Sequence, residues 1–130
     1  MDKKNSILIV DDESLNITAL SYILSSDYTI YVEKDGQGCI ESARKLKPDL
    51  ILLDIIMPDM SGFEVIKVLK EDLKTHDIPV VFITGLNSAK DEELGFNLGA
   101  ADYINKPFSA IVVKLRIQNQ IQIINQMRTI

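Results

Sequence analysis

The most constraining feature of the sequence is an unbroken aliphatic run that ends on an acid. Residues 50–53, Leu-Ile-Leu-Leu, contain no polar side chain, and Asp54 follows them directly. A strand with one face in water would alternate apolar and polar residues, so this run predicts a short strand buried on both faces. Residues 57–62, Met-Pro-Asp-Met-Ser-Gly, then turn the chain. We therefore expect Asp54 at the carboxyl end of a central parallel strand, where open α/β sheets bind their ligands.

Strand-like and helix-like segments alternate along the whole chain. Besides 50–53, the runs that favour strands are 7–10, 29–32, 78–83 and 102–105. Helical spacing follows each of them, in a helix after Ser14, one stopped by Lys47-Pro48, one over 62–72, one over 89–98 and one from about Ser109. Such alternation, five times over, predicts an α/β fold with a parallel sheet and helices on both faces.

The spacing of apolar residues also predicts which side of each helix is buried. Ser14 is expected to cap the first helix. The expected inner faces are Leu15, Ala19, Ile23 and Leu24, then Ile40, Ala43 and Leu46, then Phe63, Val65, Ile66 and Leu69. In the last helix the stripe is Ala110, Val113, Ile117, Ile124 and Met127, with Gln120 in one polar position. This helix would reach Met127 with a length of about 28 Å.

Composition excludes several classes of protein. With 130 residues and 46% hydrophobic content, the chain can form one domain with an ordinary core. The net charge of −5 argues against nucleic-acid binding and against an acidic membrane surface. Cys39 is the single cysteine and His76 the single histidine, which excludes an internal disulfide and a zinc site of several histidines. The N-terminal residues 1–5 precede an apolar run too short for a signal peptide, and we expect a soluble, cytoplasmic protein.

Residues with chemical potential stand at the ends of the predicted strands. Asp11 and Asp12 follow the first strand, Asp54 the third, Thr84 ends the fourth, and Lys106 follows the fifth. Because the carboxyl ends of parallel strands share one edge, these side chains can converge. Each alone has a plainer reading: helix caps for the first two acids, a strand-end hydroxyl, a surface lysine and, for Tyr103, packing.

Three carboxylates and a lysine at one edge suggest phosphoryl transfer to a carboxylate. Like charges brought close together destabilise one another, and a hard cation with oxygen ligands relieves this. Mg²⁺ suits such a site because it binds one or two carboxylates, keeps waters and pairs with phosphate. A carboxylate beside it can act as a nucleophile and form an aspartyl phosphate. The metal and a lysine would then neutralise charge on the transferring oxygens.

The chain resembles the receiver domains of bacterial two-component response regulators. The residues that carry the resemblance are Ile7-Leu8-Ile9-Val10-Asp11-Asp12-Glu13, Leu53-Asp54-Ile55-Ile56-Met57-Pro58-Asp59-Met60-Ser61-Gly62, Phe82-Ile83-Thr84-Gly85 and Gly99-Ala100-Ala101-Asp102-Tyr103-Ile104-Asn105-Lys106-Pro107-Phe108. The match runs from about Ser6 to about Gln118. It implies a flavodoxin-like, five-stranded parallel sheet in the order 2-1-3-4-5.

The resemblance also implies roles for single residues. Asp54 would be the phosphoacceptor, with a histidine kinase or phosphotransfer protein as donor. Asp12 would ligate Mg²⁺ directly, Asp11 largely through water, and the Ile56 backbone carbonyl would complete the protein ligands. The remaining implied residues are Lys106 as the phosphoryl contact, Pro107 after a cis peptide bond, and Thr84 and Tyr103 as the switch pair. Their movement would alter the face made by the fourth helix, fifth strand and fifth helix.

The resemblance leaves other functions and the C-terminal end open. We expect a receiver over 1–118, then a helical extension over 119–130. The extension is either a frayed helix end, a connection to an absent output domain or a homodimer seam. The chain would be no enzyme beyond its own phosphorylation and dephosphorylation. The alternatives are a phosphorylation-independent pseudo-receiver, a flavodoxin-like electron carrier and a haloacid-dehalogenase-type phosphohydrolase, which would need an acid where Ile56 stands.

Overall fold

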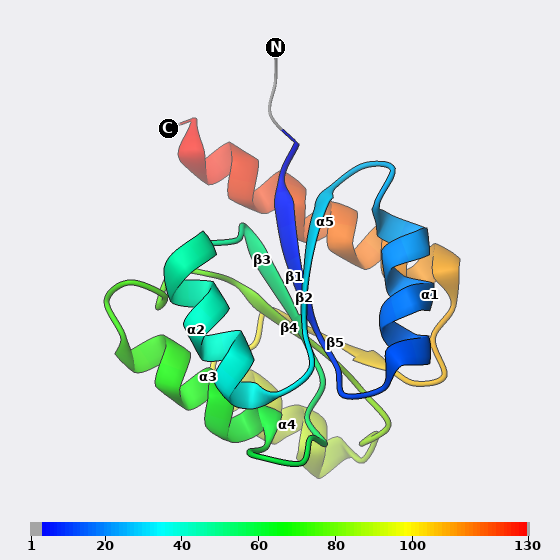
Figure 1. Cartoon of the computed structure of the whole chain (residues 1–130), viewed down its shortest axis with the longest axis vertical. Helices are drawn as coiled ribbons and strands as arrows, with labels where there is room; N and C mark the ends of the chain where they lie inside the picture. The colour runs from blue at the N-terminus through cyan, green and yellow to red at the C-terminus, as the bar shows by residue number, and fades with distance from the viewer. Residues whose placement is uncertain (1–3, 130) are drawn as a thin grey trace.

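The computed structural model describes residues 4–129, so what the sequence predicts for residues 1–3 and 130 lies outside the described residues. Five strands and five helices alternate along the chain, as predicted (Figure 1). The strands are β1 (Ser6–Val10), β2 (Thr29–Glu33), β3 (Leu50–Leu53), β4 (Val80–Thr84) and β5 (Asp102–Asn105). The helices are α1 (Ser14–Leu24), α2 (Gly36–Leu46), α3 (Gly62–Glu71), α4 (Ala89–Asn97) and α5 (Ala110–Arg128).

The strands form one parallel sheet in the order β2-β1-β3-β4-β5, which confirms the predicted topology. All four residues of β3 are buried, and the strand lies between β1 and β4 with Leu53 paired to Val10 and Phe82. The run that ends on Asp54 is therefore the centre of the sheet. The predicted fourth strand began two residues too early, since β4 starts at Val80.

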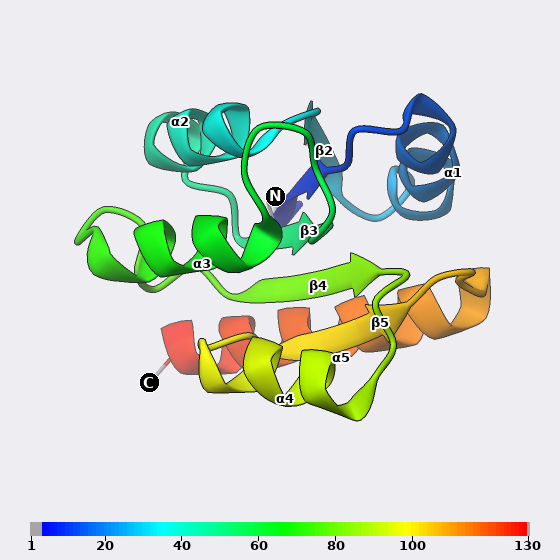
Figure 2. The ribbon, with the colours of Figure 1, turned by 90° about the horizontal axis from the view of Figure 1, so that it is seen from below.

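Helices cover both faces of the sheet (Figure 2), and the sheet separates the core into two clusters. Alternate strand residues contribute to each cluster, as the pleat of a strand requires. On the side of α2, α3 and α4 they are Leu8, Val10, Ile51, Leu53, Val80, Phe82 and Tyr103. On the side of α1 and α5 they are Ile7, Ile9, Leu50, Leu52, Val81, Ile83 and Ile104. This double covering explains why the strands read as continuous aliphatic runs.

The predicted inner face of α1 was wrong in part. Leu15 is 84% exposed, whereas Leu20 and Leu24 are buried. Nine residues separate Leu15 from Leu24, which is about two and a half turns, so the two side chains point in opposite directions. Ser14 is the first helical residue instead of the cap, and its hydroxyl accepts a hydrogen bond from the Lys34 ammonium.

Two other helices differ from the predicted pattern at their ends. In α2, Leu46 is the last residue and is 40% exposed. In α5, the ends of the predicted stripe, Ala110 and Met127, are exposed. Val113, Ile117, Ile121 and Ile124 are the buried residues of that helix. Ile121, which follows the polar Gln120, continues the stripe, and the helix ends one residue beyond the predicted Met127.

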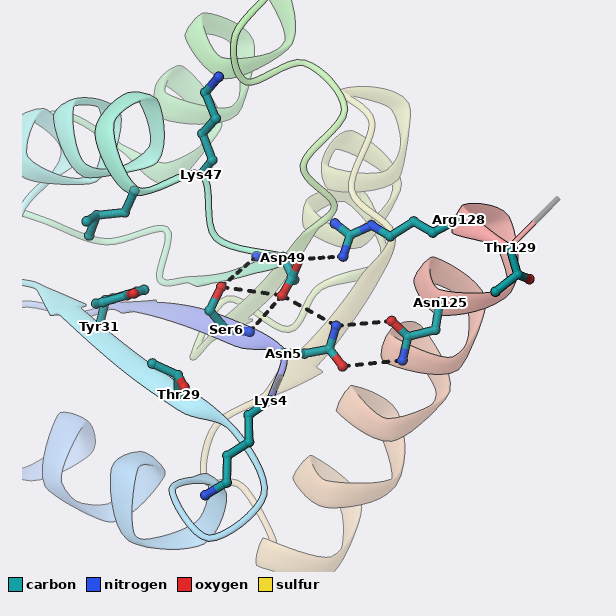
Figure 3. A pocket seen from close by; sticks show the side chains of 11 residues that line it. Lys4, Asn5, Ser6, Thr29, Tyr31, Lys47, Asp49, Asn125, Arg128 and Thr129 are labelled. Atoms are coloured by element: carbon teal, nitrogen blue, oxygen red, sulfur yellow. Dashed lines mark hydrogen bonds and ion pairs between the residues drawn. The ribbon is translucent and has the colours of Figure 1, made fainter. Parts of the chain in front are cut away.

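The last turns of α5 are attached to the amino ends of β1 and β3 (Figure 3). The attachment, which we call the amino-edge cluster, consists of Asn5, Ser6, Asp49, Asn125 and Arg128. Asp49 accepts hydrogen bonds from the Ser6 backbone N–H at 2.8 Å and from the Asn5 amide at 3.4 Å, and its other oxygen lies 2.6 Å from the Arg128 guanidinium. The side-chain amides of Asn5 and Asn125 bond to each other in both directions. These contacts fix the C-terminal end of α5 beside the start of β1.

None of the helices formed by residues 4–129 combines the length and the apolar character that a membrane crossing would need.

Candidate functional site

Three acidic side chains meet at the carboxyl edge of the sheet. Asp11 and Asp12 follow β1, Asp54 follows β3, and one carboxylate oxygen from each lies within 4.8 Å of the others. Asp11 is fully buried and Asp54 is 4% exposed, whereas Asp12 is exposed. The neighbouring β1 and β3 hold the group together because the Asp54 N–H donates to the Val10 carbonyl. The convergence expected from strand polarity is therefore present.

Lys106 bridges two of these acids. Its ammonium lies 2.8 Å from the Asp11 carboxylate and 2.8 Å from the Asp54 carboxylate, and its side chain is 16% exposed. Burial favours the neutral amine, but the hydrogen bonds to Asp11 and Asp54 outweigh it and raise the pKa of Lys106. Lys106 is therefore protonated at neutral pH, and its ammonium pairs with the two buried carboxylates. The peptide bond between Lys106 and Pro107 is cis, as the resemblance implies.

Backbone donors fix the second oxygen of each buried acid. The Asp54 Oδ1 atom accepts the Ile55 N–H at 2.7 Å and the Ile56 N–H at 3.3 Å. The Asp11 Oδ1 atom accepts the Glu13 N–H at 2.9 Å. These are local turns of the kind that aspartate favours. The plainer reading of Asp11 and Asp12 as helix caps was wrong, because Glu13 is the N-cap of α1 and no side chain caps that helix. Each buried carboxylate therefore presents one oxygen to Lys106 and the other to the backbone.

Thr84 and Tyr103 both form hydrogen bonds to the backbone of Leu86. Thr84 is fully buried, and its hydroxyl oxygen accepts the Leu86 N–H at 3.4 Å. The Tyr103 hydroxyl donates to the Leu86 carbonyl, and its ring packs edge-on against Phe82. Burial, followed by the carboxylates of Asp91, Glu92 and Asp54, raises the pKa of Tyr103 to about 12. The Tyr103 phenol therefore remains a hydrogen-bond donor at neutral pH.

The oxygen atoms of the cluster suit a small hard cation. Two ligands on opposite sides of Mg²⁺ are roughly 4.2 Å apart, given metal–oxygen distances of 2.0–2.1 Å. The three carboxylate oxygens fall within 4.8 Å of one another, a spacing comparable to this separation. The site also has three carboxylates against one ammonium, a surplus of negative charge that a divalent cation would offset. The acidic cluster can therefore hold such an ion.

One contact near the site could not be foreseen from sequence. The Asp59 carboxylate lies in the loop after Asp54 and accepts the backbone N–H groups of Gly36 and Gln37, at 2.9 Å each. These partners come from the start of α2, more than 20 residues earlier in the chain. Only the close approach of the loop to α2, which sequence spacing does not encode, brings them together.

Comparison with known proteins gives the family. A family model described as the response regulator receiver domain matches residues 7–118. The chain belongs to this family. Receiver domains of two-component response regulators act in signalling, and the arrangement of the strand-end residues agrees with phosphorylation-based signalling. The predicted family and the predicted flavodoxin-like fold are both confirmed.

Several relatives and solved structures are similar to this receiver domain. It is 44% identical over 117 residues to a probable cyclic di-GMP phosphodiesterase of Vibrio cholerae, covering 90% of this chain and 26% of the relative. It is 40% identical over 119 residues to the alkaline phosphatase synthesis transcriptional regulatory protein PhoP of Bacillus subtilis, covering 91% and 48%. The chain thus spans a quarter to a half of these relatives. The structure of the chemotaxis response regulator CheY4 of Vibrio cholerae matches with a TM-score of 0.85 and 26% identity, covering 91% of this chain and 99% of that one.

Proposed function

We propose that this receiver domain is a signalling switch in which Asp54 accepts a phosphoryl group. The observation that carries the proposal is the ammonium of Lys106, held 2.8 Å from both Asp11 and Asp54 in a chain of the receiver family. A lysine in this position is close enough to the Asp54 carboxylate to neutralise charge on an incoming phosphoryl group. Asp54 is the nucleophile in this proposal, and Lys106 and Thr84 are the residues that contact the phosphoryl oxygens.

We propose Mg²⁺ as the cofactor, with Asp12 and Asp54 as direct ligands, Asp11 mainly through water and the Ile56 backbone carbonyl as the remaining protein ligand. When bound, the ion would supply positive charge at the transferring oxygens. The exposure of Asp12 supports this assignment, because a ligand at the rim of the site lets the ion enter from water. Ile56 is 60% exposed and stands at the same rim.

The proposed reaction changes one bond at phosphorus for another. An oxygen of Asp54 forms the new P–O bond while the bond from phosphorus to the donor breaks, and the donor leaves with that electron pair. The donor would be a phosphohistidine of a histidine kinase or of a phosphotransfer protein. Lys106 keeps its proton throughout and only compensates charge. Beyond its own phosphorylation and dephosphorylation we assign this chain no catalytic activity.

The proposed response lies in Thr84, Tyr103 and the face formed by α4, β5 and α5. Thr84 accepts the Leu86 N–H, and Tyr103 donates to the carbonyl of the same residue. A movement of Thr84 toward a phosphoryl group would release the Leu86 N–H and so disturb the carbonyl that Tyr103 binds. This change would favour one of two pre-existing arrangements of the face, which is a population shift. We propose that this signalling takes place in the cytoplasm and that this chain binds neither nucleic acid nor membranes directly.

We propose that residues 119–130 lead from the receiver, residues 1–118, toward an output region. The family match ends at residue 118, while α5 continues to Arg128 and buries Ile121 and Ile124 against the sheet. The exposed side of α5 also carries two pairs of apolar residues, and the members of each pair are four residues apart. They are Ile111 and Leu115, then Ile123 and Met127, and the polar Asn119 stands between the pairs. These residues support a homodimer through the last helix, and sedimentation of wild type and Ile123→Lys tests it.

The experiment that tests the proposed function is a mass measurement. The protein is incubated with acetyl phosphate and MgCl₂, and its intact mass is read. We expect the gain of one phosphoryl group, which is absent in Asp54→Asn and in the presence of a chelator. The matched control is Asp49→Asn, at the opposite edge of the sheet, which should gain the group like wild type. No gain by wild type with any phosphodonor would contradict the proposal and favour a phosphorylation-independent interaction module.

A further inference from the structure

The loop that follows Asp54 closes the first turn of a helix from another part of the chain. Residues 55–61 connect β3 to α3 and, in Figure 2, rise beside the start of α2. Asp59 accepts the Gly36 N–H with one carboxylate oxygen and the Gln37 N–H with the other. The same loop contains Ile56, three residues before Asp59. The Ile56 backbone carbonyl is a ligand in the proposed metal site.

The first turn of α2 depends on Asp59 for half of its free donors. A helix begins with four backbone N–H groups that have no partner within the helix. At α2 these are the N–H groups of residues 35–38, and the Asp35 side chain accepts that of Gly38. Two more of these donors, Gly36 and Gln37, bond to Asp59. These hydrogen bonds lower the pKa of Asp59, so the carboxylate stays charged at the positive end of the helix.

Packing leaves the loop little freedom to rearrange around this contact. A Cβ atom added to Gly36 would lie 2.3 Å from the Met60 side chain, so α2 and the loop are already in close contact. A Cβ atom added to Gly62 would lie 2.4 Å from the Asp54 carbonyl. The Gly62 N–H also donates to the Ile55 carbonyl at 2.8 Å. The loop is thus held at its base by α3 and at its tip by α2.

Asp59 supplies the hydrogen bonds that attach the tip of the loop to α2. Among the hydrogen bonds of the described residues, its two are the ones that join residues 55–61 to an element outside the β3–α3 segment. At the base of the loop, the Ile55 and Ile56 N–H groups donate to the Asp54 carboxylate. The Ile56 carbonyl therefore lies between these bonds at the base and the Asp59 bonds at the tip.

We propose that Asp59 is a positioning residue for the metal site: by binding the first turn of α2, it holds the loop so that the Ile56 carbonyl faces the acidic cluster. Asp59 does not touch the ion in this proposal. It acts through the backbone of residues 56–58. The inference rests on the proposed function, because it assigns a role toward the same metal.

The test is Mg²⁺ binding by the unphosphorylated protein, which needs no phosphodonor. MgCl₂ is titrated into ¹⁵N-labelled protein, and the amide resonances of Ile55 and Ile56 report the dissociation constant. Asp59→Ala should weaken the affinity about 10-fold, the lower end of the effect of residues that support metal ligands. Asp59→Asn keeps one oxygen acceptor and should fall between Asp59→Ala and wild type.

Asp35→Ala is the matched control. It removes a side-chain cap from the same helix terminus, the bond to the Gly38 N–H, but leaves the loop after Asp54 untouched. Both alanine variants should lower the melting temperature, whereas Asp59→Ala alone should weaken Mg²⁺ binding. Wild-type affinity in Asp59→Ala, or an equal loss in Asp35→Ala, would overturn the positioning role while leaving the proposed function intact. A wild-type protein that binds no Mg²⁺ would overturn both.

Discussion

Each of the two edges of the sheet pairs acidic and basic side chains, but the two edges balance charge differently. At the carboxyl edge, Asp11, Asp12 and Asp54 lie close together, and the Lys106 ammonium pairs with Asp11 and Asp54. At the amino edge, Asp49 is one acid that meets Arg128 and several neutral donors. Asp11 and Asp54 are buried, and Asp49 is partly exposed, with 18% of its side chain in contact with solvent.

The difference shows which cluster is built for a further ligand. At the amino edge, N–H and O–H donors already occupy both oxygens of Asp49, and one guanidinium matches its charge. At the carboxyl edge, three acids lie beside one ammonium, and the exposed Asp12 has no hydrogen-bond or ion-pair partner among residues 4–129. A surplus of buried negative charge is costly without a counterion. The amino edge therefore attaches the end of α5, and the carboxyl edge is the edge that could hold a cation.

The largest expected effect is the loss of the buried cation. Lys106→Met should lower the free energy of unfolding, measured by urea denaturation without divalent cations, by about 3 kcal/mol. The reason is that Asp11 and Asp54 would remain buried without their partner. Arg128→Met, the matching change at the amino edge, should cost less than about 1 kcal/mol because that side chain is 57% exposed. Equal costs at the two edges would remove the distinction between them.

The next effect is stabilisation by Mg²⁺ itself. An ion that binds only the folded state adds about 2.7 kcal/mol at a concentration 100 times its dissociation constant. Urea denaturation with and without MgCl₂ should show this gain in wild type and in Asp49→Asn. Asp12→Asn should lose most of it, because the substitution removes one of the three carboxylates of the cluster. A gain in Asp12→Asn as large as in wild type would place the ion elsewhere.

A smaller effect concerns the fastening of α5. Asp49→Ala should cost about 1 to 2 kcal/mol of stability, because it removes the acceptor of the Ser6 N–H and the partner of Arg128. Hydrogen exchange should rise in residues 119–128, while phosphoryl uptake at the opposite edge remains at the wild-type level. Unchanged exchange in this segment would mean that Ile121 and Ile124 alone hold the end of the helix.

The smallest effect is the pH dependence of the amino edge. Burial would raise the pKa of Asp49, but hydrogen bonds from Ser6, Arg128 and Asn5 outweigh it and lower the pKa. A carboxylate with a lowered folded-state pKa stabilises above its unfolded value of about 3.9, and this contribution disappears as pH falls through the folded value. The stability difference between wild type and Asp49→Asn should therefore be constant near neutral pH and shrink below about pH 4. A difference that grows on acidification would contradict this sign.

The sequence was most informative where strand polarity decides position. Asp11, Asp54 and Lys106 follow β1, β3 and β5 at the same edge of a parallel sheet, so their convergence could be predicted from strand polarity. The inner face of α1 was predicted wrongly in part, because apolar character placed Leu15 in the core although it lies on the opposite side of the helix from Leu24. The helical period sets these two residues on opposite sides in any helix that contains both, so they cannot both face the sheet.

Contacts between loops and distant elements could not be predicted at all. Asp49 meets Ser6 across 43 residues, and Asp59 meets Gly36 across 23. Neither pair has a periodic signal, because each depends on how a connecting segment packs against the start of another strand or helix. Such contacts fix the ends of α5 and the loop after Asp54, the two places where the structure adds most to the sequence.

The most direct test of the central claim is to locate the phosphoryl group. Wild type treated with acetyl phosphate and MgCl₂ is reduced with borohydride, which converts an aspartyl phosphate to homoserine, and its peptides are sequenced by mass spectrometry. We expect homoserine at position 54 only, dependent on Mg²⁺, with Asp11, Asp12 and Asp49 unchanged. Homoserine at another aspartate, or at position 54 without a divalent cation, would contradict the account.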